Sequence, residues 1–564
     1  MAKQADELDF LREEIKTGLA EVSKHIKANP PFITLIGLIR ELDVQLTIPY
    51  KSDVANPSVL DLYKHGWQSL FKEAYRLFDM VPRPMFFPSS REHIEDARML
   101  LNFSGRVGIC QQFLYYLRYG MIRVAEVAGQ NVEFEPNYKY FGVERFDIEY
   151  RAFLSEHIIE RIIEERKAQH SLSFETIQLL IRRTAEKPHP QFMAYVAPEE
   201  VSDFFRRQGH YMILRLQEHE NFGPDDLFGG LPYRVYVDAV EYLMGVALMH
   251  VHYALAVLER HPQTFLANLL PYLRPESSFI GMLAEGIDVT ESQARQILDC
   301  LTLDKVNYEG YTDFTAAAPP PFIRMSEGNL LRSVAGCMIN PFQLLNYELK
   351  RRYEKDYFRA VNNREVQFRR DLFNFFPQEH IIKLNKGMML STPLGSTDID
   401  AVLYDRHAGT AALIQLKWPD GYGDSMRRRQ SAMTNYYSKA NEWVEKVHSW
   451  VKTPNARTTF FDKLQIQVAG EERASFKGFY IIVLNRYTAH FTSGEPSEKA
   501  AWGSWAQLIA TLATGMNHKP DDPLGAAYFC LRYFDPKRRI DREGVPKPMR
   551  FDMKIGASRL IMDK

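Results

Sequence analysis

Apolar residues recur at three- and four-residue spacing through most of the first 345 residues, which is the periodicity of amphipathic helices. Clear examples are "ERFDIEYRAFLSEHIIERIIEERKAQ" and "SFETIQLLIRRTAEKP", and the second ends at a proline. We therefore expect residues 1–345 to form a mainly helical region that regulates, senses or oligomerises.

One part of this region predicts a more specific element. Thr290 and Gln293 in "VTESQARQILDC" have the spacing of a capping box at a helix start. With the preceding "SSFIGMLAEGI", this pattern is compatible with a helix-turn-helix or winged-helix element near residues 279–304. Two short helices joined by a turn are also common in proteins that do not bind DNA, so both interpretations stay open.

The pattern changes after Pro377. "HIIKLNKGMML", "TDIDAVLYD" and "TAALIQLKW" predict three strands, and the apolar run "FKGFYIIVLNR" predicts a strand buried on both faces. Long helices are predicted from "DSMRRRQSAMTNYYSKANEWVEKVHSWVK" and "AWGSWAQLIATLATG". The expected fold class is therefore α+β and multidomain. A helical part is followed, from about residue 346 to residue 564, by a mixed α/β domain with a basic C-terminal extension.

Four polar residues lie in the second and third of these strands: Asp398, Asp400, Gln415 and Lys417. A four-residue loop, 406–409, would pair Asp405 with Thr410. Continued along the antiparallel strands, this register sets Asp400 opposite Gln415. It also sets Asp398 opposite Lys417, so all four side chains would share one face of the hairpin.

Carboxylates among apolar strand residues need compensation for their lost hydration. A divalent cation is one solution, since Mg²⁺ takes carboxylate and carbonyl oxygens and keeps several waters. An ordinary ion pair, such as Asp398 with Lys417, is the other. The spacing of these residues does not choose between the two.

The arrangement of an aspartate in "TDID", a hairpin and a polar-x-Lys strand end resembles the PD-(D/E)XK nuclease superfamily, above all its nuclease-related-domain and Mrr-like restriction branches. The resemblance covers about residues 355–515. It matches the metal-binding aspartate to Asp400, the Glu or Gln position to Gln415 and the catalytic lysine to Lys417. It also matches an upstream helical glutamate to Glu365. Asp398 remains an auxiliary candidate.

This resemblance implies an Mg²⁺-dependent, or Mn²⁺-dependent, hydrolase of DNA phosphodiester bonds, with RNA as a second candidate substrate. Restriction or antiviral defence is the implied context, and a homodimer or higher oligomer is expected. The chain has Gln415 where the family usually has glutamate. The alternatives are thus a nuclease-fold protein that binds nucleic acid without cutting it, or an interaction scaffold built on the helical part.

Cationic and aromatic residues flank the predicted site. Arg427, Arg428, Arg429 and Gln430 open the helix that follows the lysine strand, and a helix N-terminus attracts phosphate. Trp418 directly follows Lys417 and could stack on a base. We expect these five residues to contact nucleic acid.

Charge is divided unevenly along the chain. Residues 351–564 hold 34 Lys and Arg against 24 Asp and Glu, whereas the whole chain has a net charge of −1. A basic C-terminal part suits a polyanion partner. The stretch 242–258 is apolar but holds two histidines, which favours a buried core helix over a membrane span. The charged N-terminus and four widely spaced cysteines predict a cytoplasmic protein with reduced thiols and no membrane association.

Overall fold

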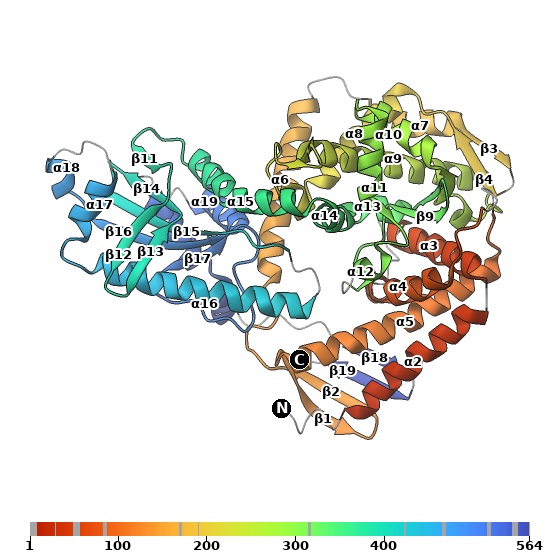
Figure 1. Cartoon of the computed structure of the whole chain (residues 1–564), viewed down its shortest axis with the longest axis horizontal. Coiled ribbons are helices and arrows are strands. Elements are labelled where there is room, and N and C mark those ends of the chain that lie inside the picture. Colours follow the sequence, from red (N-terminus) through yellow and green to blue (C-terminus); the bar gives the residue numbers. More distant parts are fainter. Residues whose placement is uncertain are drawn as a thin grey trace.

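The computed structural model describes residues 8–28, 30–48, 57–82, 87–167, 172–189, 191–313, 317–421, 425–464, 470–515, 521–543, 551–555 and 557–562. Helices dominate its N-terminal part, and a mixed sheet with helices on both faces follows (Figure 1). The fold is α+β and multidomain, as the sequence predicts. The four cysteines are free and buried.

Four long helices form an N-terminal bundle. They are α2 (Asp9–Ala28), α3 (Pro31–Thr47), α4 (Pro57–Leu77) and α5 (Arg91–Arg118). Glycines let the backbones of α4 and α5 approach closely. A Cβ atom at Gly105 would lie 2.2 Å from the carbonyl oxygen of Leu62, so a larger residue there would push the two helices apart.

A small sheet joins the segment 122–136 to the segment 551–562. Its strands, in spatial order, are β1 (Ile122–Ala128), β2 (Asn131–Pro136), β19 (Ser558–Met562) and β18 (Phe551–Ile555). Strand β19 runs parallel to β2, and Figure 1 shows both C-terminal strands beside the N-terminal bundle. The end of the basic extension thus packs on the N-terminal part, an arrangement that local sequence patterns do not indicate. Residues 544–550 of this extension lie outside the described residues.

The middle of the helical part is built around one apolar helix. Its elements are α6 (Arg145–Lys167), α7 (Phe174–Thr184), β3 (Ala185–His189), β4 (Phe192–Tyr195), α8 (Glu199–Ile213), β5 (Leu227–Phe228), β6 (Leu231–Pro232) and α9 (Tyr233–Arg260). Within the described residues, α9 alone is long and apolar enough to cross a membrane, but 67% of its most apolar stretch is buried inside the protein. It is a core helix, as the sequence predicts.

The predicted pair of helices near residues 279–304 is present, and a small sheet belongs to the same part of the fold. Its elements are β7 (Tyr272–Pro275), α10 (Glu276–Gly286), α11 (Glu291–Cys300), β8 (Thr302–Leu303), α12 (Tyr308–Thr312), β9 (Phe322–Ser326) and β10 (Asn329–Arg332). The sheet order is β7-β10-β9-β8, so the hairpin β9–β10 lies between β7 and β8. Thr290 and Gln293 form the expected capping box at the start of α11.

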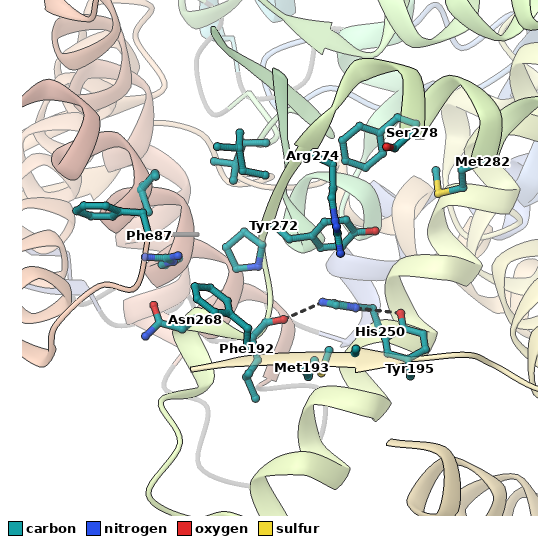
Figure 2. Close-up of a pocket in the computed structure, with 18 residues that line it drawn as sticks. Phe87, Phe192, Met193, Tyr195, His250, Asn268, Tyr272, Arg274, Ser278 and Met282 are labelled. Atoms are coloured by element: carbon teal, nitrogen blue, oxygen red, sulfur yellow. Dashed lines mark hydrogen bonds between the residues drawn. The ribbon is translucent and has the colours of Figure 1, made fainter. Parts of the chain in front are cut away.

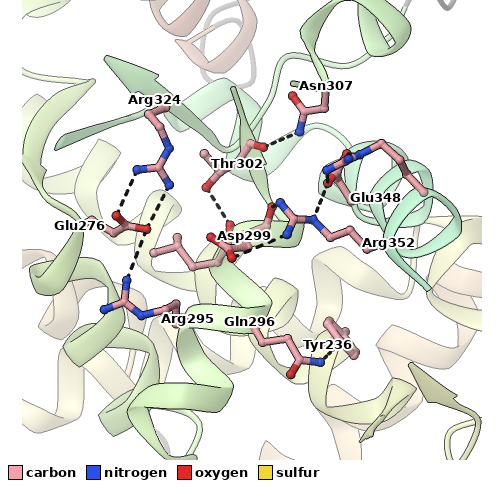
Figure 3. A network of polar contacts seen from close by, with 12 residues as sticks. Tyr236, Glu276, Arg295, Gln296, Asp299, Thr302, Asn307, Arg324, Glu348 and Arg352 are labelled. Carbon is pink, nitrogen blue, oxygen red and sulfur yellow. Dashed lines mark hydrogen bonds and ion pairs between the residues drawn. The ribbon is translucent and has the colours of Figure 1, made fainter. Parts of the chain in front are cut away.

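Several polar side chains of α11 are engaged within the protein (Figure 3). Arg295 lies 3.9 Å from Glu276, which also accepts two 3.0 Å hydrogen bonds from Arg324. The amide nitrogen of Gln296 donates to the Tyr236 hydroxyl at 2.8 Å. Through these contacts α11 packs within its own domain. The contacts do not support DNA binding by this helix, which stays a prediction.

The second half of the chain surrounds a five-stranded mixed sheet. The sheet has the order β11 (Ile381–Leu384), β14 (Ala401–Asp405), β15 (Thr410–Lys417), β16 (Gly478–Asn485) and β17 (Ala501–Ser504). A separate hairpin is formed by β12 (Met388–Thr392) and β13 (Gly395–Ile399). The helices are α13 (Val334–Met338), α14 (Pro341–Arg352), α15 (Glu354–Phe375), α16 (Met426–Val451), α17 (Ala456–Leu464), α18 (Gly470–Ala474), α19 (Trp505–Gly515), α20 (Pro523–Tyr533) and α21 (Pro536–Glu543).

Helices cover both faces of this sheet, which explains its apolar strands. Leu413 of β15 packs in a cluster with residues of α16 and α17, and its neighbour Ile414 packs with residues of α15, α19 and α20. Strand β16 runs parallel to β15, as a crossover through α16 requires. The segment "AWGSWAQLIATLATG" was expected to be entirely helical, but its first four residues form β17 because they complete the sheet edge beside β16.

Candidate functional site

The hairpin of β14 and β15 has the predicted register. Asp405 pairs with Thr410 across the loop 406–409, and the ladder continues to Ala401 and Ile414. Gly409 closes the loop with a φ of 67°, a left-handed conformation that glycine adopts without strain. One residue beyond the ladder, Asp400 lies at the position facing Gln415.

Asp400 is the centre of the candidate site. Only 4% of it is exposed, and its Oδ2 atom accepts hydrogen bonds from the amide nitrogen of Gln415 and, at 2.8 Å, from the backbone nitrogen of Leu416. Within the described residues, Oδ1 has no hydrogen-bond donor. One carboxylate oxygen is therefore held in place, and the other is available to a ligand.

Glu365 reaches this site from α15, and Arg369 links it to Asp400. The guanidinium of Arg369 donates to the Glu365 carboxylate and to the backbone oxygen of Asp400. The side chain of Glu365 is 48% exposed, so solvent reaches it. Sequence reasoning identified Glu365 but missed Arg369. The spacing of an acid and an arginine four residues apart on one helix was the available signal.

Burial raises the pKa of Asp400 to about 6. The nearby charge of Lys417 and the two hydrogen bonds to Oδ2 oppose this rise, whereas the negative charge of Glu365 adds to it. Asp400, Glu365 and Lys417 thus interact electrostatically, and a cation between the two carboxylates would relieve their repulsion.

The donors at this site fit a hard divalent cation in part. Asp400 and Glu365 supply carboxylate oxygens, and Gln415 supplies an amide oxygen, the ligand type that Mg²⁺ takes together with water. The amide nitrogen of Gln415 faces Asp400, so only its oxygen could ligate a metal. The described residues contain no group of three or more His, Cys, Asp and Glu side chains with metal-binding geometry. A metal here would need water and substrate oxygens to complete its shell.

Asp398 does not join the site. It was expected opposite Lys417, but the chain bends at Asp400, and β13 pairs with β12 so that Asp398 lies opposite Met389. Its side chain is exposed, and its backbone oxygen accepts a 2.6 Å hydrogen bond from Trp443 of α16. The four-residue loop 406–409 sets Asp400 opposite Gln415, but the pairing of the two strands does not continue past the bend at Asp400.

The three arginines at the start of α16 have different environments. Arg427 and Arg428 are exposed in the first turn, where Ser425 caps the helix. Arg429 is only 6% exposed and forms an ion pair with Glu144. Arg429 was expected to contact nucleic acid, but it is used inside the protein because its side chain faces the segment before α6. Gln430, also expected at the interface, is half-buried.

Trp418 is held by other side chains. Its ring centre lies 5.9 Å from that of Phe368 and 6.2 Å from that of Tyr487, and both contacts are edge-on. The guanidinium of Arg486 lies 4.6 Å from the ring centre. The expected stacking on a base therefore competes with an existing cation–π contact.

A cavity of about 790 Å³ opens beside Lys417. Its cationic lining residues are Lys350, Lys417, Arg428 and Lys439, and its acidic ones are Glu218 and Asp420. The Asp420 carboxylate is already bound by Arg364 at 2.6 Å and by the Tyr357 hydroxyl at 3.2 Å. The cavity therefore has an excess of positive charge, and Trp418 forms part of its wall.

Comparison of the chain with protein-family models, with curated proteins and with solved structures finds no match. The geometry of the site is therefore the basis for any assignment of function.

The raised pKa of Asp400 leads to a prediction about stability. The folded protein binds this proton more tightly than the unfolded chain, so stability falls as the pH rises from about 4 to about 6. The difference between 3.8, the ordinary value, and about 6 corresponds to about 3 kcal/mol. We expect Asp400→Asn to raise the free energy of unfolding by about 1–3 kcal/mol at pH 7.5 and by less as the pH approaches 4.

Urea unfolding of the parent and of Asp400→Asn at pH 4.5 and pH 7.5 measures this effect. Asp398→Asn is the matched control, because that side chain is exposed and should leave stability unchanged at both pH values. A loss of stability in Asp400→Asn at pH 7.5 would show that burial is not the dominant influence on Asp400.

Proposed function

We propose that this protein is a metal-dependent nuclease that hydrolyses phosphodiester bonds in DNA. The observation that carries the proposal is the meeting of Asp400, Gln415 and Lys417 at one end of a buried hairpin, beside a cavity with four cationic side chains. A buried carboxylate with one oxygen that accepts no hydrogen bond is unfavourable for folding, Lys417 offsets this cost only in part, and such a cost is typical of functional sites.

The residues of the site have distinct roles in this proposal. Asp400 and Glu365, with the carbonyl oxygen of Gln415, would hold Mg²⁺ or Mn²⁺. Such an ion would supply the positive charge that polarises a scissile phosphate and lowers the pKa of an attacking water. Lys417 orients that water and offsets the negative charge that develops on the phosphate. Arg369 positions Glu365 and the backbone of Asp400 through its two contacts.

The cavity beside Lys417 suits a polyanion. Lys350 and Lys439 are exposed and line it from α14 and α16, where they can bind backbone phosphates. DNA is the proposed substrate, with RNA as the second choice, and restriction or antiviral defence in the cytoplasm is the proposed setting. Cleavage of both strands by such a site calls for two copies, so a homodimer or a higher oligomer is part of the proposal.

One observation favours a second candidate function, nucleic-acid binding without cleavage. Gln415 brings no charge, and the site holds two carboxylates, Asp400 and Glu365. A metal site with so little negative charge has a lower affinity for a divalent ion than one with three carboxylates.

Removal of the metal distinguishes the two functions. We expect the purified protein to nick supercoiled DNA in 5 mM Mg²⁺ or Mn²⁺, and EDTA to abolish the nicking, because the carboxylates cannot activate water by themselves. The assay follows conversion of supercoiled to open-circular plasmid at 50 mM salt. A protein that shifts DNA in a gel with a steep salt dependence but never nicks it would support binding without cleavage. A protein that does neither would contradict both functions.

A further inference from the structure

A second pocket, of about 400 Å³, lies in the helical part of the protein (Figure 2). Residues of α3, β4, α9, β7 and α10 surround it, and no residue of the candidate nuclease site lines it. Pockets of about 300–1,000 Å³ are the size that binds small organic molecules.

Aromatic rings form much of its wall. The aromatic lining residues are Phe87, Phe192, Tyr195, Tyr272 and Phe279. Figure 2 labels Phe87, which precedes α5, Phe192 and Tyr195 of β4, and Tyr272 of β7 around the same space, with the thioether of Met282 at one side. Rings and a thioether offer contacts that favour a flat apolar body.

The charged side chains of the pocket are all cationic. Arg40 and Arg274 line it, and the described lining residues include no Asp or Glu. Arg40 is buried and donates from one terminal nitrogen to the Ser89 hydroxyl at 2.6 Å, but its Nε atom has no acceptor within the described residues. Arg274 is exposed, and its guanidinium lies 5.8 Å from the ring centre of Tyr272.

A third arginine, Arg332, is buried next to the residues that line the pocket. Arg332 is 0% exposed, and none of its three side-chain nitrogens has a hydrogen-bond acceptor within the described residues. It follows the lining residue Leu331 in β10, and its guanidinium is 4.1 Å from the ring centre of Tyr272, which also lines the pocket. A buried guanidinium without acceptors is costly, and a cation–π contact offsets only part of that cost.

The positive charges of Arg40 and Arg332 are only partly compensated within the protein. Asp43 is the carboxylate that interacts electrostatically with both Arg40 and Arg332. Its oxygens already accept hydrogen bonds from the Ser333 hydroxyl at 2.6 Å and from two backbone nitrogens at 2.9 and 3.0 Å. Two buried guanidinium groups thus share one carboxylate, and an excess of positive charge remains beside the pocket.

His250 does not supply further charge. Burial, assisted by the positive charge of Arg332, lowers the pKa of His250 to about 3, so the ring is neutral. Its Nε2 atom donates to the backbone oxygen of Leu269 at 2.8 Å, and its Nδ1 atom accepts from the Tyr195 hydroxyl at 3.0 Å. The ring is fixed by these two bonds and holds Tyr195 in the pocket wall (Figure 2).

We propose that this pocket binds a small organic anion whose negative group is attached to a flat ring. The anionic group pairs with Arg40 and Arg274, and the ring lies among Phe192, Tyr195 and Tyr272. Nucleoside monophosphates and aryl carboxylates share this chemistry. This assignment is independent of the proposed nuclease activity, because it rests on residues of the helical part alone.

Isothermal titration calorimetry with the full chain tests the assignment. The probes are the four common nucleoside 5′-monophosphates and three aryl carboxylates (benzoate, phenylacetate and indole-3-acetate). We expect at least one probe to bind with one site per chain. Two controls lack one of the two recognised groups. The matching neutral compound, such as adenosine for AMP, has no anionic group, and inorganic phosphate has no ring. Each should bind at least about tenfold more weakly. Binding within the phosphate set identifies a nucleotide ligand, and binding within the carboxylate set identifies an aryl acid.

Arg274→Ala is the informative variant, because Arg274 is exposed and its loss does not disturb the core. It should weaken binding of the active probe by about tenfold or more. Arg183→Ala, which removes an exposed arginine of α7 outside the pocket, should leave the affinity unchanged. The assignment is wrong if no probe from either set binds, if the ring or the anion alone binds equally well, or if Arg274→Ala has no effect.

Discussion

Replacing Lys417 with alanine should lower the rate of Mg²⁺-dependent DNA cleavage by about 100- to 1,000-fold, which is the usual effect of removing one donor that stabilises developing charge. DNA affinity should change little, because Lys417 is one of four cationic residues around the cavity. The charge of Lys417 acts on the Asp400 carboxylate, so in the proposed mechanism the ammonium group would be close to the metal.

Lys439→Ala provides the matched control for this prediction. Lys439 lines the same cavity from α16, and its side chain is exposed. Its replacement should weaken DNA binding and lower the slope of binding against salt by about one counterion, with little effect on the rate at saturating DNA. Single-turnover cleavage and filter binding separate the two effects.

Two results would contradict the assignment of Lys417. Cleavage by Lys417→Ala at the parental rate would place the chemistry elsewhere in the chain. An equal loss of rate in Lys417→Ala and Lys439→Ala at saturating DNA would show that the effect is not specific to Lys417. Asp400→Ala should also abolish cleavage, since it removes the carboxylate with the free oxygen.

Replacing Arg429 with alanine should lower the free energy of unfolding by about 3–5 kcal/mol, because it leaves the Glu144 carboxylate buried without its cation. Both side chains are largely buried, and Glu144 also accepts hydrogen bonds from the backbone nitrogen and the hydroxyl of Thr492 at 3.0 and 2.8 Å. The pair thus connects α16 with the segment before α6 and with the loop after β16.

Urea unfolding measures this effect, and Arg427→Ala is the control two residues earlier in the chain. Arg427 is exposed, so its loss should change stability by less than about 0.5 kcal/mol. Glu144→Gln and the double variant complete a cycle that isolates the coupling of the pair. If Arg429→Ala unfolded like the parent but bound DNA less tightly, the original expectation of a nucleic-acid contact would be restored.

The sequence predicts more of the hairpin than of the site around it. The two apolar runs of β14 and β15 and the length of their loop were sufficient for the register that brings Asp400 to Gln415. Strand periodicity is local, so it can be read without knowledge of the rest of the chain. The bend at Asp400 cannot be read in this way, because it depends on β12 as the alternative partner of β13.

Long-range contacts explain where the structure differs from the sequence-based predictions. Local composition does not distinguish Arg427, Arg428 and Arg429 from one another. Arg429 is buried because it forms an ion pair with Glu144, 285 residues away in the chain. The pairing of β19 with β2 is also a long-range contact, and it covers a strand edge that would otherwise be unpaired.

The amino-acid sequence by itself therefore determined the helical first part, the mixed sheet and the face on which Asp400, Gln415 and Lys417 lie. Only the tertiary structure placed Arg369 between Glu365 and Asp400, opened a cationic cavity beside Lys417 and gathered three arginines at a pocket in the helical part. The physical reason is that periodicity specifies which side chains share a face, whereas burial, partner and charge balance depend on segments that are distant in the chain.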